Sequence, residues 1–303
     1  MKIALKIDVD TYRGLDVGAP RLAEFLRAQK IPASFFVSLG PDNSGWAARR
    51  LFRHRGFAKK MRRTGAVSLY GVRTVCSGTL LPARPIGTSF TGRLRAWADA
   101  GFEVSPHGYD HIRWHDRAAR WQEPAARAEL EKAARLYRSI FGKDPRSFAA
   151  PGWQAGPGVW RAMEKMNLLY HSDSRGEAPY FPDLGGEILQ TPEIPTTLPT
   201  WDEMLAWDGV SPEDLAQKTW ELLRADVLNV WTVHAEVEGS AYFPQFQAFA
   251  RRVQEAGGRW IFLPAFAESL RQNPGGVPAQ TIFQGELAGR AGTVTRQGRP
   301  AGA

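Results

Sequence analysis

The sequence contains a single cysteine, Cys76, so the chain cannot form a disulfide within itself. It also lacks any run of 18 apolar residues, the length that a membrane-crossing helix requires. Its first residues enter a predicted strand without the apolar core of a signal peptide. Together these absences predict a protein of the reducing cytoplasm.

Acidic residues are missing from one stretch of the chain, between Trp46 and Thr64. This basic stretch instead holds eight cations, namely Arg49, Arg50, Arg53, Arg55, Lys59, Lys60, Arg62 and Arg63. The net charge of the whole chain is +8, so the basic stretch accounts for all of the excess and the remainder is neutral. No nucleic-acid recognition fold accompanies the stretch, and we therefore do not expect a nucleic-acid partner.

A helix over residues 46–63 would be imperfectly amphipathic, with aromatic and apolar side chains on one arc and cations on the rest. A basic amphipathic helix of this kind favours the surface of an anionic membrane. The residues expected to contact that surface are Trp46, Arg49, Arg53, Phe57, Lys59, Lys60, Met61 and Arg63. The alternative interpretation is an ordinary basic helix exposed to solvent.

Strand and helix patterns alternate along most of the chain. Apolar or alternating runs predict strands at residues 2–8, 34–39, 102–107, 147–153, 169–176, 227–239 and 259–264. Helical spacing predicts helices at residues 91–100, 124–141, 157–169, 211–224 and 242–256, with another after the first strand. About seven such alternations predict an α/β fold, a distorted (β/α) barrel of about seven parallel strands.

This barrel is expected to form one domain over residues 1–272. Residues 41–90 break the alternation and contain the basic stretch, so they are interpreted as an insertion that faces the membrane. Residues 273–303 are rich in Gly, Pro, Ala and Gln, which predicts a partly disordered C-terminal tail.

Polar side chains follow the ends of several predicted strands. Asp8 and Asp10 end the first strand on a common face, and two neighbouring carboxylates need a positive partner. His107 and His111 follow another strand and are four residues apart. One carboxylate and two imidazoles suit a divalent ion with open positions, but they do not distinguish Zn, Mn, Co and Ni. The acids could instead cap a helix, and an isolated histidine is more often an ordinary surface residue.

A metal-assisted hydrolysis of an amide or ester is the reaction that these groups favour. A bound metal would polarise a carbonyl and acidify water, while the second carboxylate acts as the base. His234 ends a separate strand and is the best candidate for the acid that protonates the leaving group.

The motifs IDVDT, SPHGYDH, AAPGW, SDSRG and TVHAEVEG, in this order, resemble the five motifs of the polysaccharide deacetylases, carbohydrate esterase family 4. The resemblance implies Asp10, His107 and His111 as metal ligands, Asp8 as the base and His234 as the acid. It also implies a distorted barrel fold. Further substrate-binding or supporting candidates are Tyr109, Trp153, Asp173, Arg175 and Glu236.

One position departs from the family pattern. The third motif of the family often carries an arginine that holds the base, whereas this chain has Ala149 there. We therefore expect Arg175 to orient Asp8 in its place. The backbone N–H of Ala150 is expected to help stabilise the oxyanion.

The fuller pattern, which includes LPTWDE, is similar to family members that deformylate an aminosugar on a lipid. This resemblance implies a substrate of 4-deoxy-4-formamido-L-arabinose on undecaprenyl phosphate, a step in lipid A modification that protects against polymyxin. It implies a peripheral enzyme at the cytoplasmic face of the inner membrane. The alternatives are an N-deacetylase of another polysaccharide or N-acyl sugar, and a non-catalytic protein that binds membrane surfaces.

Overall fold

A computed structural model describes residues 1–51 and 72–300 of the chain. Its central strand is β1 (Lys2–Val9), which is buried along nearly its whole length because parallel strands lie on both of its sides. The sheet runs in the order β3-β2-β1-β7, and β8 pairs with the first residues of β1. These strands are β2 (Ser34–Val37), β3 (Glu103–Pro106), β7 (Leu228–His234) and β8 (Arg259–Ile261).

Short extended segments continue this sheet from β3 back to β7. The Ala149 amide, just after β4 (Ser147–Phe148), donates to the Pro106 carbonyl at 3.3 Å, and β4 pairs with β5 (Tyr170–His171). His171 then forms a parallel bridge with Glu193, and the Thr197 amide donates to the Val230 carbonyl of β7 at 3.0 Å. The backbone thus closes a ring with irregular joins, which agrees with the predicted distorted barrel.

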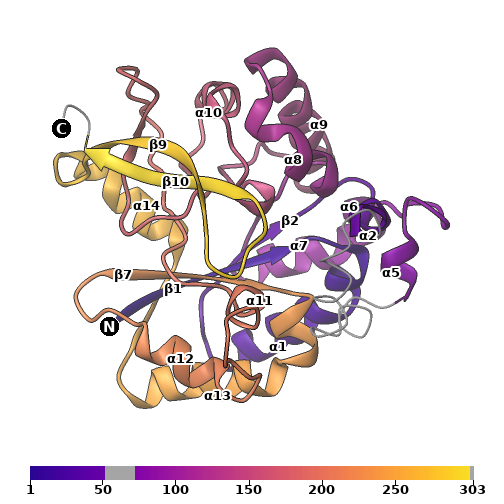
Figure 1. Cartoon of the computed structure of the whole chain (residues 1–303), viewed down its shortest axis with the longest axis vertical. Coiled ribbons are helices and arrows are strands. Elements are labelled where there is room, and N and C mark those ends of the chain that lie inside the picture. Colours follow the sequence, from indigo (N-terminus) through magenta and orange to yellow (C-terminus); the bar gives the residue numbers. More distant parts are fainter. Residues whose placement is uncertain (52–71, 301–303) are drawn as a thin grey trace.

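Helices surround the strands (Figure 1). On one side lie α1 (Ala19–Ala28), α12 (Leu215–Glu221) and α13 (Phe243–Glu255). On the other lie α8 (His111–Arg117), α9 (Glu123–Phe141) and α10 (Pro157–Glu164), while α7 (Thr91–Asp99) and α14 (Leu263–Gln272) complete the cover. The core between helices and strands is rich in aromatic rings, and Trp231 of β7 contacts both Phe246 and Phe249 of α13. Burial of these rings fixes the helices against the sheet.

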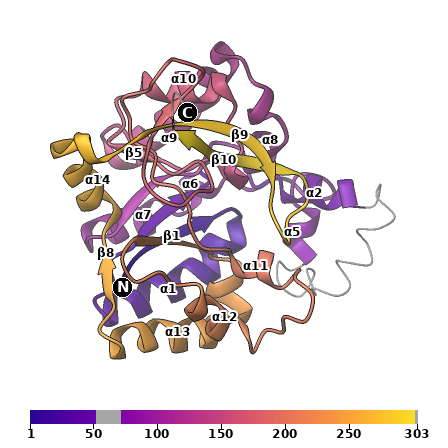
Figure 2. The ribbon, with the colours of Figure 1, turned by 60° about the vertical axis from the view of Figure 1, so that its left-hand side comes forward.

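The C-terminal residues form a hairpin, so the prediction of a partly disordered tail is wrong for residues 279–300. Strands β9 (Ala279–Glu286) and β10 (Thr293–Pro300) pair antiparallel, and β9 also pairs with β6 (Phe181–Asp183). Thr295 binds the backbone amide of Ala155, which ties the hairpin to the barrel. The hairpin lies on the opposite side of β1 from α12 and α13 (Figures 1 and 2).

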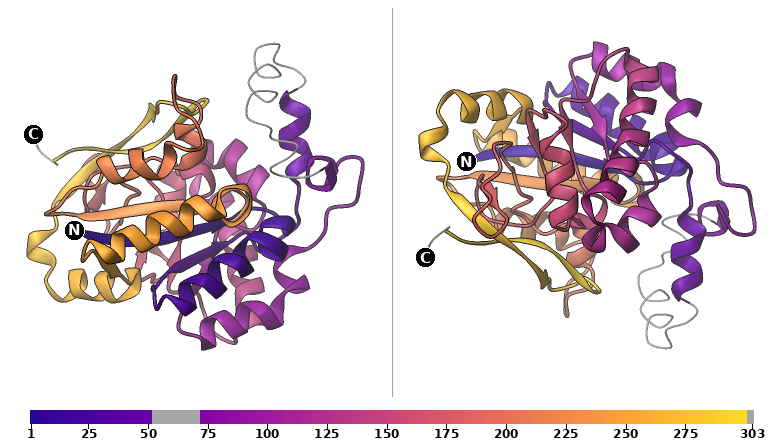
Figure 3. Two further views of the ribbon diagram at one scale, coloured as in Figure 1. Left: turned by 90° about the horizontal axis from the view of Figure 1, so that it is seen from below. Right: turned by 90° about the horizontal axis from the view of Figure 1, so that it is seen from above.

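The described parts of the insertion are three short helices, α2 (Ser44–Leu51), α5 (Val72–Cys76) and α6 (Ile86–Ser89). Its two ends lie together, because Pro41 and Pro85 form a β-bridge. Figure 3 shows α2 and α5 side by side at one edge of the molecule.

Trp46 on α2 is 46% exposed. The helix expected over 46–63 is described only to Leu51; the other proposed membrane contacts, Arg53, Phe57, Lys59, Lys60, Met61 and Arg63, lie outside the described residues. Among the described helices, none has the length and apolarity needed to cross a membrane.

Candidate metal and active site

The structure brings Asp10, His107 and His111 together at one end of the barrel. Asp10 follows β1, His107 follows β3 and His111 begins α8, whose first turn is capped by the Asp110 side chain. The Oδ1 atom of Asp10 lies 3.3 Å from Nε2 of His107 and 3.4 Å from Nε2 of His111. We call these three residues the triad. They meet because parallel strands end at the same edge of a barrel.

The chemistry of the triad suits a divalent metal. The Nδ1 atom of His107 lies 2.8 Å from the Ala149 carbonyl and must donate to it, so Nε2, which faces Asp10, is the ring nitrogen placed to bind an ion. Burial lowers the pKa of His111 despite the nearby Asp10 carboxylate, which favours a neutral ring. Burial acts to raise the pKa of Asp10, but the two histidines outweigh it and the pKa is lowered. One carboxylate oxygen and two imidazole nitrogens form a ligand set that fits Zn, Mn, Co or Ni.

Asp8 lies beside the triad with one oxygen held and the other free. Its Oδ2 atom is 3.5 Å from Nζ of Lys6 and 3.8 Å from Nε2 of His107. Its Oδ1 atom is buried and accepts no hydrogen bond from the described residues. A buried carboxylate oxygen without a donor is available to take a proton.

The expectation that Arg175 orients Asp8 is wrong. The Nη1 atom of Arg175 instead binds both oxygens of Glu203, at 2.7 and 2.8 Å, and its Nη2 atom donates to the Leu198 carbonyl. The cation beside Asp8 is Lys6, which the sequence interpretation missed. Its signal was its position two residues before Asp8, since alternate residues of a strand share a face.

His234 ends β7 directly opposite Asp8 in the strand register. Its Nδ1 atom forms an ion pair of 3.3 Å with Oδ1 of Asp202, a residue of α11 (Trp201–Met204). Burial acts to lower the pKa of His234, but Asp202, Asp10 and Asp8 together raise it well above its ordinary value. The three carboxylates therefore favour the protonated ring, which can donate a proton.

Asp202 was also missed by the sequence interpretation. It lies in the LPTWDE pattern, where Thr200 and Glu203 form a capping box that starts α11. The pattern T-x-x-E is a recognisable signal for such a helix start. It could have placed Asp202 on a short helix, although it would not have identified its partner.

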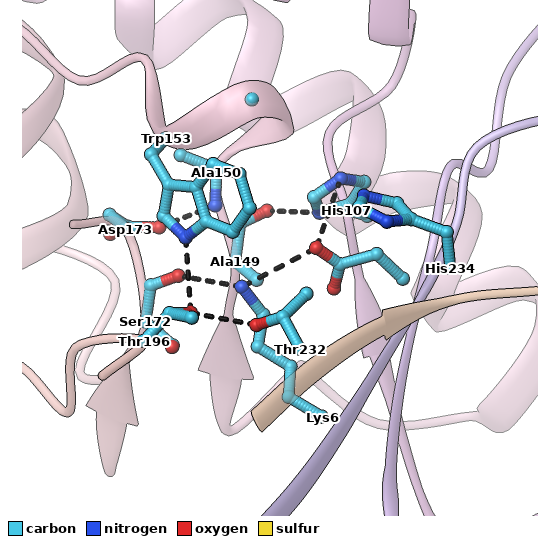
Figure 4. Close-up of polar contacts among 12 residues, drawn as sticks. Lys6, His107, Ala149, Ala150, Trp153, Ser172, Asp173, Thr196, Thr232 and His234 are labelled. Atoms are coloured by element: carbon cyan, nitrogen blue, oxygen red, sulfur yellow. Dashed lines mark hydrogen bonds and ion pairs between the residues drawn. The ribbon is translucent and has the colours of Figure 1, made fainter. Parts of the chain in front are cut away.

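The expectation that the Ala150 amide binds an oxyanion is wrong, because this N–H donates to Oδ1 of Asp173 at 2.5 Å. Asp173 thereby fixes the turn whose Ala149 carbonyl accepts the hydrogen bond from His107 (Figure 4). The other oxygen of Asp173 lies 3.2 Å from Nδ1 of His171. Burial opposes the charge on His171, but Asp173 and Glu193 raise its pKa to about 10.

His171, Asp173 and Glu193 could by composition hold a second metal. However, Glu193 accepts hydrogen bonds from the Asp173 and Ser174 amides and from the Ser174 hydroxyl. We interpret this cluster as an internal ion pair that fixes the loop after β5, because both oxygens of Glu193 and Oδ1 of Asp173 already have donors.

The remaining candidates lie around the site in different roles. Glu236 accepts hydrogen bonds from the amides of Asp10 and Thr11, so it holds the loop that presents the triad carboxylate. The ring of Trp153 lies edge-on to His234, with centroids 6.5 Å apart. Tyr109 points elsewhere, with its ring 6.0 Å from Nζ of Lys132 in a cleft beside α9.

Comparisons with known proteins identify a family and several relatives of this chain. Residues 3–171 match the family described as polysaccharide deacetylase. The chain is 35% identical over 296 residues to a probable 4-deoxy-4-formamido-L-arabinose-phosphoundecaprenol deformylase, ArnD, of Shewanella sediminis, covering 98% of this chain and 94% of that protein. It is 28% identical over 288 residues to the protein of the same name from Wigglesworthia glossinidia brevipalpis, covering 94% and 98%.

Two solved structures show the same fold at low sequence identity. A putative polysaccharide deacetylase from Mycobacterium smegmatis matches with a TM-score of 0.62 and 18% identity, over 94% of each chain. A Puue allantoinase matches with a TM-score of 0.61 and 15% identity, over 90% of each chain.

Proposed function

We propose that this chain, which belongs to the polysaccharide deacetylase family, is a metal-dependent deformylase of a lipid-linked aminosugar. Its substrate would be 4-deoxy-4-formamido-L-arabinose on undecaprenyl phosphate, the compound in the names of its relatives. The observation that carries the proposal is the grouping at one end of the barrel of the triad, a free carboxylate oxygen on Asp8, and His234 paired with Asp202.

A divalent ion held by Asp10, His107 and His111 would polarise the formyl carbonyl and make an attacking water more acidic. The free Oδ1 atom of Asp8 would accept the proton of that water as its oxygen bonds to the formyl carbon. His234 would give its proton to the sugar nitrogen as the C–N bond breaks. The products are formate and the free amine, and one water molecule is consumed.

The charge on His234 suits this acid role, because a neutral imidazole would have no proton for the leaving nitrogen. Asp202 keeps that proton in place, since its carboxylate lies 3.3 Å from the opposite ring nitrogen. Asp8 is the residue directly across the strand register from His234. The base and the acid thus come from neighbouring strands and approach the substrate from two sides.

We also propose that the enzyme acts at the cytoplasmic face of the inner membrane, as a peripheral protein. The lipid of the proposed substrate lies in the bilayer, and the basic stretch of the sequence would attract an anionic membrane surface. Trp46, near the start of this stretch, is partly exposed on α2. This attachment would keep the barrel near the lipid headgroups.

The decisive experiment compares formate release from the formamido sugar on undecaprenyl phosphate with acetate release from its N-acetyl analogue. Protein reconstituted separately with Zn, Mn, Co and Ni would identify the active metal. Formate release that greatly exceeds acetate release supports a deformylase. Preferred acetate release would favour an N-deacetylase, and no release with any metal would favour a binding protein. The Asp8→Asn and His234→Ala variants serve as inactive controls.

A further inference from the structure

Lys6 is a fully buried lysine in the interior of the barrel. It lies on β1 two residues before Asp8, and its Nζ atom is 3.5 Å from Oδ2 of that carboxylate. The same nitrogen donates a hydrogen bond of 3.1 Å to the Ser172 carbonyl. Figure 4 shows the amine directed from β1 into the polar cluster around Ser172, Ala149 and His107.

Aromatic rings flank the amine and limit where it can move. Nζ lies 5.6 Å from the ring centre of Phe36 and 5.5 Å from that of Trp153. Such ring faces attract a cation and at the same time exclude water from it. A buried ammonium without a carboxylate partner is strongly unfavourable. Asp8 supplies that partner, while the nearby Asp173 is already held by His171 and the Ala150 amide.

We propose that Lys6 is a positioning residue for Asp8, a role that the third motif of this chain, with Ala149, does not supply. This inference rests on the proposed function, in which Asp8 is the base. Lys6 holds Oδ2 and so fixes the rotation of the carboxylate. Oδ1, which has no donor among the described residues, then stays directed to the substrate side.

The geometry explains why Lys6 and Ala149 occur together. Ala149 is fully buried and its side chain is too short to reach Asp8. Its carbonyl is nevertheless needed, because it accepts the hydrogen bond that orients His107. Lys6 supplies from β1 the cation that pairs with Asp8. The turn at Ala149 can therefore position His107 without also providing a cation for Asp8.

The first test compares Lys6→Met, which removes the charge at similar length, with Lys6→Arg and the control Lys2→Met. Lys2 is an exposed lysine on the same strand. We expect Lys6→Met to bind metal as the wild type does, with a similar KM and a kcat at least tenfold lower. Lys6→Arg should recover part of that loss, and Lys2→Met should behave as the wild type. A wild-type kcat in Lys6→Met would overturn the proposal.

The second test asks whether Lys6 acts through Asp8, by a double-mutant cycle with Asp8→Asn. If it does, adding Lys6→Met to Asp8→Asn should cause no further loss of the residual turnover. The double variant should also recover part of the thermal stability that Lys6→Met alone loses, because it leaves no unpaired charge buried. Independent, multiplicative losses of turnover would overturn the proposal.

Two further outcomes are distinguishable. If Lys6→Met alone does not fold, the double variant should still fold with both charges removed, and its failure would show that Lys6 serves the fold without Asp8. If the wild type releases no formate, the deformylase proposal fails, but turnover of the N-acetyl substrate and the stability cycle still test the pair.

Discussion

The ion pair between Asp202 and His234 allows the change in the pKa of His234 on mutation to be estimated from the structure. The perturbation is Asp202→Asn, which keeps the shape of the side chain and removes its charge. The control is Asp208→Asn, which removes the charge of an exposed acid shortly after α11. Because Asp202 raises the pKa of His234, its loss should lower that pKa and deprotonate the proposed acid at a lower pH.

The magnitude follows from distance and exposure. Two unit charges 3.3 Å apart attract by about 5 kcal/mol at an effective dielectric constant of 20. The side chain of Asp202 is 41% exposed, however, so water screens the pair and about 1–2 kcal/mol is a better expectation. This corresponds to about one pKa unit for His234. Asp8 and Asp10 still act to raise this pKa in the variant.

The first assay is the pH dependence of kcat. Activity that requires protonated His234 is lost as pH rises through its pKa, and Asp202→Asn should move this alkaline limb down by about one unit. The second assay is the free energy of unfolding of the metal-free protein. His234 has a raised pKa when folded, so the pair contributes fully below the unfolded value of about 6.5 and is lost as pH rises through the folded value.

Asp202 sets the lower limit of the pH range in which the ion pair stabilises the fold. Its pKa is lowered in the folded state because His234 outweighs the effect of burial, so its contribution is lost as pH falls. The stability difference between the wild type and Asp202→Asn should thus be largest between about pH 4 and 6.5. The pairing would be refuted if Asp202→Asn left the alkaline limb of the kcat profile unchanged and if the difference in unfolding free energy from the wild type did not vary with pH.

The remaining predictions concern the metal, the proton transfers and the membrane. Alanine at any one position of the triad should abolish metal binding, and full occupancy by elemental analysis in all three variants would contradict the ligand assignment. Asp8→Asn and His234→Ala should each keep the metal and lose about a hundredfold or more in kcat, so a near wild-type rate in either would assign its role elsewhere. Replacing the cations of the basic stretch at 49, 53, 59, 60 and 63 by Gln should release the protein from anionic vesicles and spare a short soluble substrate, because each cation near the surface contributes about 1 kcal/mol. Wild-type binding should weaken with salt, and unchanged sedimentation of the five-Gln variant would place the membrane contact elsewhere.

The sequence predicted the strands that carry the triad because their apolar runs end abruptly in acids and histidines. Once a parallel barrel is inferred, its strand ends must meet, and this brought Asp10 and His107 together without any knowledge of distances. The prediction of a strand through Gly239 was too long, since β7 ends at His234 and Val237–Ala241 form a short helix. Gly239 lies against Gly18 there, where a Cβ atom would meet the Gly18 carbonyl oxygen at 2.6 Å.

The sequence places Lys6 on the same face as Asp8, but it could not predict that Lys6 is buried, because its burial depends on how the barrel closes. The strand KIALKID places Lys2, Lys6 and Asp8 on one face, and alternation alone marks that face as polar and exposed. Lys2 is indeed exposed, yet Lys6 is fully buried on the same face. The difference arises because Trp153 and Ser172, far along the chain, cover the second half of the strand.

Composition misled the prediction for the C-terminal residues for a related reason. Gly, Pro and Gln disfavour a packed core of their own, but β9 and β10 are stabilised by pairing with β6 and by contacts with the barrel. The turn between them carries Arg290, whose guanidinium lies 4.8 Å from the ring centre of Trp153 and 3.6 Å from Glu203. A segment interpreted as a tail therefore lies against the ring that flanks both Lys6 and His234.

These contacts give the two halves of the chain different parts of the same site. The first half supplies the triad and Asp8, and it coincides with the residues that match the family, 3–171. The second half supplies the proposed acid and its partner Asp202, together with Glu236, which holds the loop of Asp10 from across the barrel. The ring of Trp153 lies near cations from both halves, namely Lys6, Arg175 and Arg290. A change in the hairpin at Arg290 can therefore reach Lys6 through this ring, which connects the base side of the site to the second half of the chain.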